Sequence, residues 1–178
     1  MQLHETMPDV FYAAGQRIGL DRASLDFLKE RAAASARGQC RICLHKAPDA
    51  TVHEMVIAQR RGFYSRPHRH LQKTEAFLLI EGEVDLIRFD DGGAISEIIQ
   101  MGPPGVGVYY HRVPPLTWHC LNIRSEFVIF HETAEGPFDP AATVFPTWAP
   151  EPGDATRAAE FTGAVARSIA NRMGRQPS

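Results

Sequence analysis

The chain has 178 residues, which is long enough for one domain with a full hydrophobic core. Its 44% hydrophobic and 22% charged residues are ordinary for a globular protein, and a formal net charge of −2 does not indicate a nucleic-acid or membrane partner. No apolar run approaches the roughly 20 residues of a membrane span. Residues 1–16 lack the basic start and apolar stretch of a secretory signal, so we expect the cytoplasm as the location.

The N-terminal part of the chain combines an irregular stretch with a helical one. Residues 1–20 show no clear hydrophobic period, and we expect them to be loosely ordered. Residues 21–37 predict a helix that Asp21 caps and Gly38 ends. Its apolar side chains recur at helical spacing and should pack on the main body; they are Leu25, Leu28 and Ala32.

From residue 38 to about residue 133, short apolar or alternating runs are separated by turn residues. The predicted strands are residues 41–46, 53–60, 64–70, 75–82, 83–90, 95–101, 107–113, 117–123 and 126–132. A tight hairpin is expected at residues 91–93, and prolines mark further corners. Because no helix separates these strands, the pattern favours an antiparallel sandwich or barrel over a parallel α/β fold.

Residues 134–154 are rich in proline and small residues and predict an extended tail. Its aromatic residues could anchor it on the barrel or on a neighbouring subunit; they are Phe138, Phe145 and Trp148. Residues 155–172 predict a C-terminal helix, capped by Asp154. Its buried stripe should be formed by Phe161, Val165 and Ile169.

Cysteine usage does not suggest a disulfide framework, because the number is odd and no secretory signal is found. Cys40 and Cys43 have the spacing of a zinc-binding pair, but no second pair is evident. A strand over this segment would place their sulfur atoms on opposite faces, which favours two unconnected thiols. Cys120 is expected to face away from His119, into packing between the sheets.

The stretch RPHRHLQKTE, residues 66–75, concentrates metal-binding side chains. On a strand, His68 and His70 point to the same side and can grip one ion. Glu75 follows on the next strand, and His119 lies on another predicted strand about fifty residues later. Three imidazole nitrogens and one carboxylate oxygen suit iron, manganese, nickel, zinc or copper. The simpler interpretations, a basic surface and scattered structural histidines, leave this spacing unexplained.

The spacing also resembles a known family. Gly62, His68, His70, Glu75 and Gly82 match every fixed position of the first sequence motif of the cupin superfamily. The second motif is only partly present: His119 is in place, but Leu116 replaces a glycine and Asn122 comes one position early. Residues 41–150, with the elements RPHRH, KTE, EG and FHETAEGPF, resemble the WbuC family of cupin-fold metalloproteins, although Leu71 replaces an expected proline.

This resemblance implies an all-β double-stranded β-helix, the cupin jelly roll, with an added N-terminal and C-terminal helix. Three parts are then expected: an N-terminal extension (1–37), the cupin barrel domain (38–133) and a proline-rich tail with the C-terminal helix, packed on the same domain (134–178). The resemblance also implies one divalent transition-metal ion, with iron, manganese, zinc and nickel not distinguished. The resemblance also leads us to expect a homodimer, encoded among genes for bacterial surface polysaccharides.

Three further residues are candidates for substrate binding. Tyr64 and Arg66 share the strand parity of the two histidines, so Arg66 could bind an anionic substrate, unless Pro67 turns it towards solvent. His131 lies in another predicted strand and could line the pocket, although a structural role is the simpler alternative. No catalytic residue can be assigned from the sequence.

Two functions follow as hypotheses. The first is a metal-dependent enzyme, an isomerase, epimerase or oxygenase, acting on a small polar molecule such as a sugar or sugar acid. The alternative is a non-catalytic cupin that binds or senses a small molecule through the metal. A metal-independent epimerase on the same fold is disfavoured, because it would not need the full ligand set.

Overall fold

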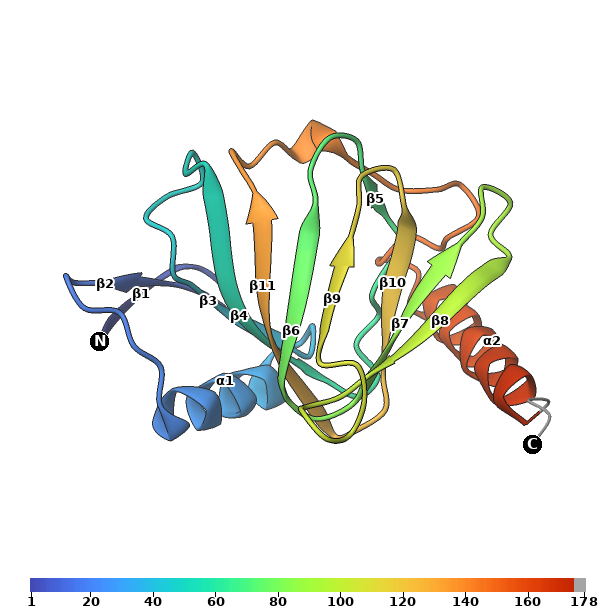
Figure 1. Cartoon of the computed structure of the whole chain (residues 1–178), viewed down its shortest axis with the longest axis horizontal. Coiled ribbons are helices and arrows are strands. Elements are labelled where there is room, and N and C mark those ends of the chain that lie inside the picture. The colour runs from blue at the N-terminus through green and yellow to red at the C-terminus, as the bar shows by residue number, and fades with distance from the viewer. Residues whose placement is uncertain (175–178) are drawn as a thin grey trace.

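A computed structural model describes residues 1–174 as two facing β-sheets with one helix at either end of the molecule (Figure 1). The helices are α1 (Arg22–Ala34) and α2 (Ala155–Met173), with a short 3-10 turn at Pro140–Ala142. The strands are β1 (Gln2–Met7), β2 (Val10–Ala14), β3 (Gln39–Cys43), β4 (Val52–Arg60), β5 (Arg69–His70), β6 (Glu75–Glu81), β7 (Val84–Phe89), β8 (Ile95–Met101), β9 (Tyr110–Val113), β10 (Trp118–Ile123), β11 (Phe127–Glu135) and β12 (Thr143–Val144).

The larger sheet has the strand order β1-β2-β3-β4-β11-β6-β9, and the smaller sheets have the orders β10-β7-β8 and β12-β5. β2 runs parallel to β3, and the other strand pairs are antiparallel. Just before β5, His68 exchanges two backbone hydrogen bonds with His119 of β10, at 3.0 and 2.9 Å. The two small sheets therefore form one wall opposite the large sheet, which confirms the predicted all-β double-stranded β-helix.

The main core lies between the two walls and excludes water almost completely. Side chains of both walls meet there, including the fully buried Leu86 of β7, Met101 of β8 and Phe130 of β11. Along β11, alternation sends Val128 and Phe130 into this core and Ile129 to the outer face. Strand parity therefore decides which side chains reach the barrel interior.

The two helices cover the outer faces of the two walls. Asp21 caps α1 by accepting a hydrogen bond from the Ser24 amide at 2.9 Å, and Leu28 and Ala32 are completely buried beneath the helix. Asp154 caps α2 in the same way. The buried stripe of α2 packs on β7 and β10, as predicted; it consists of Phe161, Val165 and Ile169. Both predicted helices are thus confirmed, with the first ending three residues early.

Two expectations about the local chain are wrong. Residues 1–20 contain the β1–β2 hairpin, whose turn depends on Asp9 in a left-handed conformation (φ 63°), a signal that hydrophobic periodicity does not carry. Residues 64–70 form a strand only at their end, because Pro67 has no amide hydrogen for a ladder. Within the proline-rich tail, Trp148 packs on Phe89 and Phe161, as expected, whereas the side chain of Phe138 is 56% exposed and its amide donates to the carbonyl oxygen of Pro48 at 2.7 Å.

The cysteines are buried and free. Cys40 packs beneath α1 and Cys43 packs in the main core, which confirms that their sulfur atoms lie on opposite faces of the strand. Cys120 faces away from His119, as expected, but it packs under α2 and not between the two walls. Burial raises the pKa of Cys40 to about 12, so this thiol stays protonated and unreactive at neutral pH.

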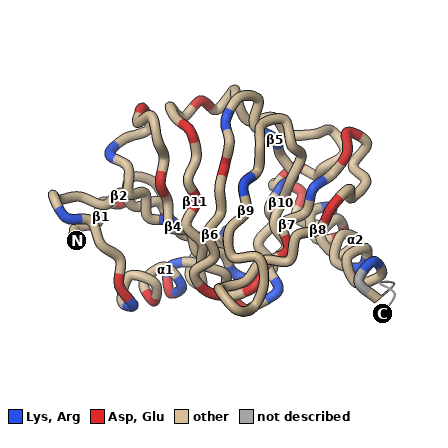
Figure 2. The backbone as a smooth tube through the Cα atoms, in the orientation of Figure 1, with Lys and Arg blue, Asp and Glu red and all other residues tan. Residues whose placement is uncertain are grey.

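The charged residues of both signs are interspersed along the chain, and Figure 2 shows no broad tract of a single sign in this view. Among residues 1–174, no helix is long and apolar enough to span a membrane.

Candidate metal centre

The four side chains that the sequence singles out converge at one end of the barrel interior. One nitrogen of His68, one nitrogen of His119 and one carboxylate oxygen of Glu75 lie within 4.8 Å of one another. His70 is not one of these three, but it contacts Glu75, with its Nε2 2.7 Å from Oε1. Nε2 of His119 lies 3.3 Å from the other oxygen, Oε2. Adjacent ligands with bonds of about 2.1 Å to one ion are separated by about 3 Å, so these spacings fit a shared metal.

Each imidazole has its other ring nitrogen fixed by an oxygen atom. Nδ1 of His68 lies 2.9 Å from the carbonyl oxygen of Arg66, and Nδ1 of His119 lies 2.9 Å from that of Thr117. Since a carbonyl oxygen can only accept, each Nδ1 carries the proton and each Nε2 keeps its lone pair. Nδ1 of His70 meets the hydroxyl of Thr143 on β12, at 3.0 Å. Oxygen partners of this kind orient metal-binding histidines.

The environment favours a neutral His68 ring and a charged Glu75 carboxylate. Burial, followed by the nearby His119, lowers the pKa of His68 to about 3, so its ring is neutral at pH 7. Burial opposes the charge on Glu75, but His119 and His70 outweigh burial and hold the pKa of this carboxyl well below its usual value. The buried Nε2 atoms of His70 and His119 face the carboxylate oxygens of Glu75, at 2.7 and 3.3 Å. Imidazole nitrogens grouped around a buried carboxylate are a donor set that suits a divalent ion.

A turn of unusual backbone geometry links the segment of His70 to the segment of His119. Leu116, which stands where the cupin motif has glycine, adopts a left-handed conformation with φ 62°. Its amide donates a hydrogen bond to the carbonyl oxygen of His70 at 2.8 Å, three residues before His119. The chain therefore keeps the backbone shape that glycine would adopt, at a strain of roughly 1–2 kcal/mol. Asn122, the other displaced motif position, points away from the centre and donates to Asp85 at 2.9 Å.

The structure places the three predicted substrate-binding residues outside this cluster. The Tyr64 hydroxyl donates to the carbonyl oxygen of Pro150 at 2.9 Å, and its ring packs on Phe161 of α2. Both Nη atoms of Arg66 bind the carboxylate of Glu151, at 2.7 and 2.8 Å, so its charge is already neutralised. His131 shares the outer face of β11 with Ile129, and its nearest ionic partner is Glu54 at 4.0 Å.

Glu132 is the residue that the sequence analysis missed on this strand. Because it alternates with Phe130, it faces the barrel interior, one position after the histidine that was chosen. Burial, and then the charge of Glu75, raise the pKa of Glu132 to about 8, against weaker opposing effects of Lys73 and Arg41. The sequence could have indicated that Glu132 faces the interior, because Val128 and Phe130 occupy the preceding alternate positions of the same strand.

This raised pKa predicts a pH-dependent stability. The folded protein holds a proton on Glu132 that the unfolded chain releases above its ordinary pKa of 4.5, so the folded state loses stability as the pH rises from about 4.5 to 8. Glu132→Gln removes this effect and keeps the shape of the side chain. In metal-free protein, the Tm of the variant minus that of the wild type should therefore increase between pH 5 and pH 8.5. A difference that stays constant over this range would contradict the protonated carboxyl.

Comparison with known proteins supports the fold but does not identify a function. A family described as "Domain of unknown function (DUF6016)" matches residues 20–101, which include the first three candidate ligands but not His119. No curated protein matches the chain significantly.

Solved structures similar to this chain have low sequence identity. Protein SO0799 from Shewanella oneidensis is 12% identical, with a TM-score of 0.51 over 62% of this chain and 75% of its own. A Klebsiella pneumoniae protein with a double-stranded β-helix domain is 15% identical, with a TM-score of 0.47 over 61% and 84%. The capsular polysaccharide assembling protein CapF from Staphylococcus aureus is 21% identical, with a TM-score of 0.48 over 60% of this chain and 29% of CapF. The similarity to SO0799 concerns the fold alone: an all-β double-stranded β-helix, which this chain extends by one helix at each end.

Proposed function

We propose that this protein is a metal-dependent enzyme acting on a small polar molecule such as a sugar or sugar acid. His68, His70, Glu75 and His119 would hold one divalent transition-metal ion, with iron, manganese, zinc and nickel all compatible. The observation that supports this most strongly is the set of imidazoles whose Nδ1 atoms are fixed by oxygen partners, while the buried Nε2 atoms of His70 and His119 face the carboxylate of Glu75. A bound ion would polarise hydroxyl or carbonyl oxygens of the substrate or activate a water molecule.

The groups around the centre prepare it for a polar ligand. The Nζ atom of Lys73 lies 3.7 Å from Oε1 of Glu75 and its side chain is 21% exposed, so it can meet a ligand that approaches from solvent. The ring of Phe145, from the tail, lies 6.2 Å from the ring of His68 and carries the guanidinium of Arg66 on its face. Lys73 therefore offers a cation, and Phe145 an apolar surface, next to the ligand set.

The finer assignment rests on the sequence resemblance. We propose membership of the WbuC-type cupin-fold metalloproteins and a role linked to surface-polysaccharide biosynthesis in the cytoplasm. The elements that support it surround the centre in space: RPHRH supplies two of the candidate ligands, and FHETAEGPF contains Glu132.

The test is turnover by protein loaded with its preferred ion. A panel of aldoses and uronic acids would be followed by proton NMR for isomerisation and epimerisation, and by an oxygen electrode for oxidation. We expect one substrate class to react. The reaction should stop when a chelator removes the ion and resume when the ion is added back. Equal turnover by metal-free protein would contradict the proposal. A ligand that binds tightly and is recovered unchanged would instead establish the non-catalytic alternative.

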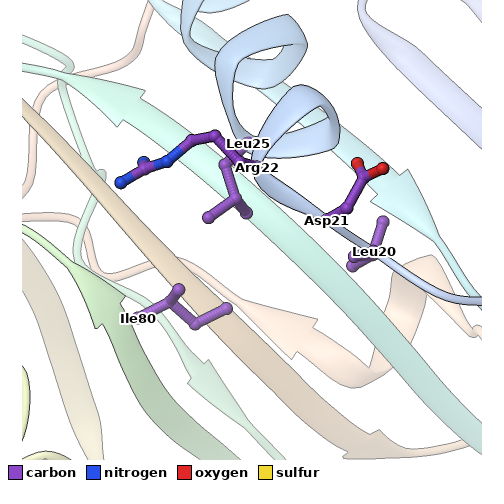
Figure 3. Close-up of a pocket in the computed structure, with 5 residues that line it drawn as sticks. All are labelled: Leu20, Asp21, Arg22, Leu25 and Ile80. Atoms are coloured by element: carbon purple, nitrogen blue, oxygen red, sulfur yellow. The ribbon is translucent and has the colours of Figure 1, made fainter.

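We also propose that the protein acts as a homodimer. On the outer face of the large sheet, Leu78, Ile80 and Tyr110 are 38%, 36% and 53% exposed, which is unusual for neighbouring apolar side chains. Beside them lies a pocket of about 400 Å³, lined by Leu25 and its neighbours at the start of α1 and by Ile80 of β6. Figure 3 shows these side chains. Sedimentation of the wild type tests this proposal, and a monomer at micromolar concentration would contradict it.

A further inference from the structure

A polar pair lies on the interior face of the β10-β7-β8 sheet, directly beside the candidate centre. Arg88 of β7 is the direct cross-strand partner of His119 on β10 and of Glu97 on β8. Because directly paired residues share a face, all three side chains point to the interior, in one row across the three strands. Neighbouring strands are about 4.8 Å apart, so no other residue of the row separates Arg88 from the candidate ligand.

This row is open to solvent although it belongs to the interior face. The side chains of Arg88 and Glu97 are 36% and 50% exposed. Leu86, two residues before Arg88 on the same face, is completely buried in the main core. The apolar core of this wall therefore ends at Leu86, and a ligand from solvent can reach the row that leads to His119.

The facing wall contributes a histidine to the same space. His111 of β9 pairs directly with Phe77, a main-core residue whose ring centroid lies 6.4 Å from that of His119. His111 therefore also points into the interior. Burial lowers the pKa of His111, while Glu97 acts to raise it and Arg88 and His119 act to lower it. These charges thus act on one another across the space between the two walls.

Glu97 occupies only part of the Arg88 guanidinium. Its Oε2 accepts one hydrogen bond, from Nη1 of Arg88 at 2.7 Å. Within residues 1–174, no hydrogen bond occupies Nε or Nη2 of Arg88. These two atoms form one edge of the planar guanidinium, and such an edge matches the two oxygens of a carboxylate. Arg66 differs, because both of its Nη atoms already bind Glu151.

We propose that Arg88 binds a carboxylate of the substrate through Nε and Nη2, while the metal centre beside it takes another oxygen of the same molecule. The substrate class is then a hydroxy carboxylate of a few carbon atoms, such as a sugar acid, and not a neutral sugar. Glu97 positions the guanidinium, and His111 faces the bound molecule from β9. This inference rests on the proposed metal-dependent function and specifies the substrate class of the same site.

The test compares acids with neutral counterparts on Zn²⁺-loaded protein by isothermal titration calorimetry. The probes are D-gluconate beside D-glucitol and D-galacturonate beside D-galactose. We expect at least one acid to bind the wild type more tightly than its neutral partner. Arg88→Gln should weaken that acid by roughly 10- to 100-fold, the usual effect of losing a hydrogen bond to a charged group, and leave the neutral partner unchanged. Arg88→Lys keeps the charge without the two-pronged geometry and should fall between.

Two further variants separate ligand binding from a structural role of the ion pair. Glu97→Gln removes the resident negative charge, so the acid should bind at least as tightly as it does to the wild type. If the pair only stabilised the sheet, Arg88→Gln and Glu97→Gln would weaken binding together. Arg22→Gln is the matched control, because Arg22 also donates from Nη1 to a single glutamate, Glu81, at 3.0 Å, outside the barrel interior.

Zinc content is measured in every sample, which distinguishes the two ways of failing. The carboxylate subsite is overturned, while the metal site stands, if the zinc-loaded wild type binds neither acid or binds acids and neutral sugars equally. It is also overturned if Arg88→Gln keeps the acid affinity of the wild type or if Arg22→Gln lowers it as much. If the wild type takes up no zinc, the proposed function fails together with it.

Discussion

Replacement of Gly82 by alanine is expected to lower the free energy of unfolding by more than about 3 kcal/mol, a large share of the 5–15 kcal/mol that is typical of a domain. Gly82 follows β6 with φ 82°, a left-handed conformation that alone costs alanine roughly 1–2 kcal/mol. An added Cβ would also lie 2.1 Å from the carbonyl oxygen of Phe127 and 2.6 Å from Oγ of Ser125. Because the nearest of these atoms belongs to the backbone, the segments around Gly82 and Phe127 would have to move apart.

Gly62 provides the matched comparison. It has a similar φ of 89°, but a Cβ there would meet no atom within 4 Å. Gly62→Ala should therefore cost only the conformational part, roughly 1–2 kcal/mol. Urea unfolding of both variants measures the difference. Equal costs would show that Gly82 is required for its backbone conformation and not for the close approach of residue 127.

The second large effect concerns metal-dependent stability. At a metal concentration of 100 times Kd, binding should stabilise the wild type by about 2.7 kcal/mol relative to its metal-free form. His119→Ala removes a ligand whose side chain is almost completely buried, and should weaken binding more than 100-fold, leaving less than about 0.4 kcal/mol at the same metal concentration. Each variant is compared with its own metal-free form, so any cavity left by His119→Ala cancels.

Thr143→Val separates the ligands from the groups that orient them. It removes the hydroxyl beside Nδ1 of His70 and keeps the branched shape of the side chain. Loss of such an outer partner typically costs 10- to 100-fold in affinity, which corresponds here to a residual stabilisation of roughly 0.4–1.4 kcal/mol. Differential scanning calorimetry with and without metal gives both values. If His119→Ala keeps the full metal-dependent stabilisation, His119 is not a ligand.

The fold was largely predictable from local patterns. The strands that alternate, β4, β6, β7, β10 and β11, have one face in the main core, and both helices begin at an aspartate cap. The β1–β2 hairpin was not predictable, because its apolar residues pack only after the chain returns beside β3. The same holds for β12, which exists only because it pairs with β5.

The candidate centre shows where residue spacing is informative and where it is not. Strand spacing together with the resemblance to the cupin motifs predicted His68, His70, Glu75 and His119 as ligands, and His68, Glu75 and His119 lie close enough to hold one ion. Strand alternation does not apply to Arg66, because residues 64–67 are not part of a strand. The carboxylate that binds Arg66, from Glu151, lies 85 residues further along the chain. Tertiary pairing of this kind leaves no trace in a local pattern.

The metal content of freshly purified protein, measured by elemental mass spectrometry beside His70→Ala, tests the central claim most directly. Nε2 of His70 lies 2.7 Å from Glu75, so its removal should open the ligand set without disturbing the backbone bridge between His68 and His119. We expect about one equivalent of a divalent transition metal in the wild type, the number that a single four-ligand site holds, and little in the variant. No metal in either protein, even after reconstitution, would contradict the proposed centre.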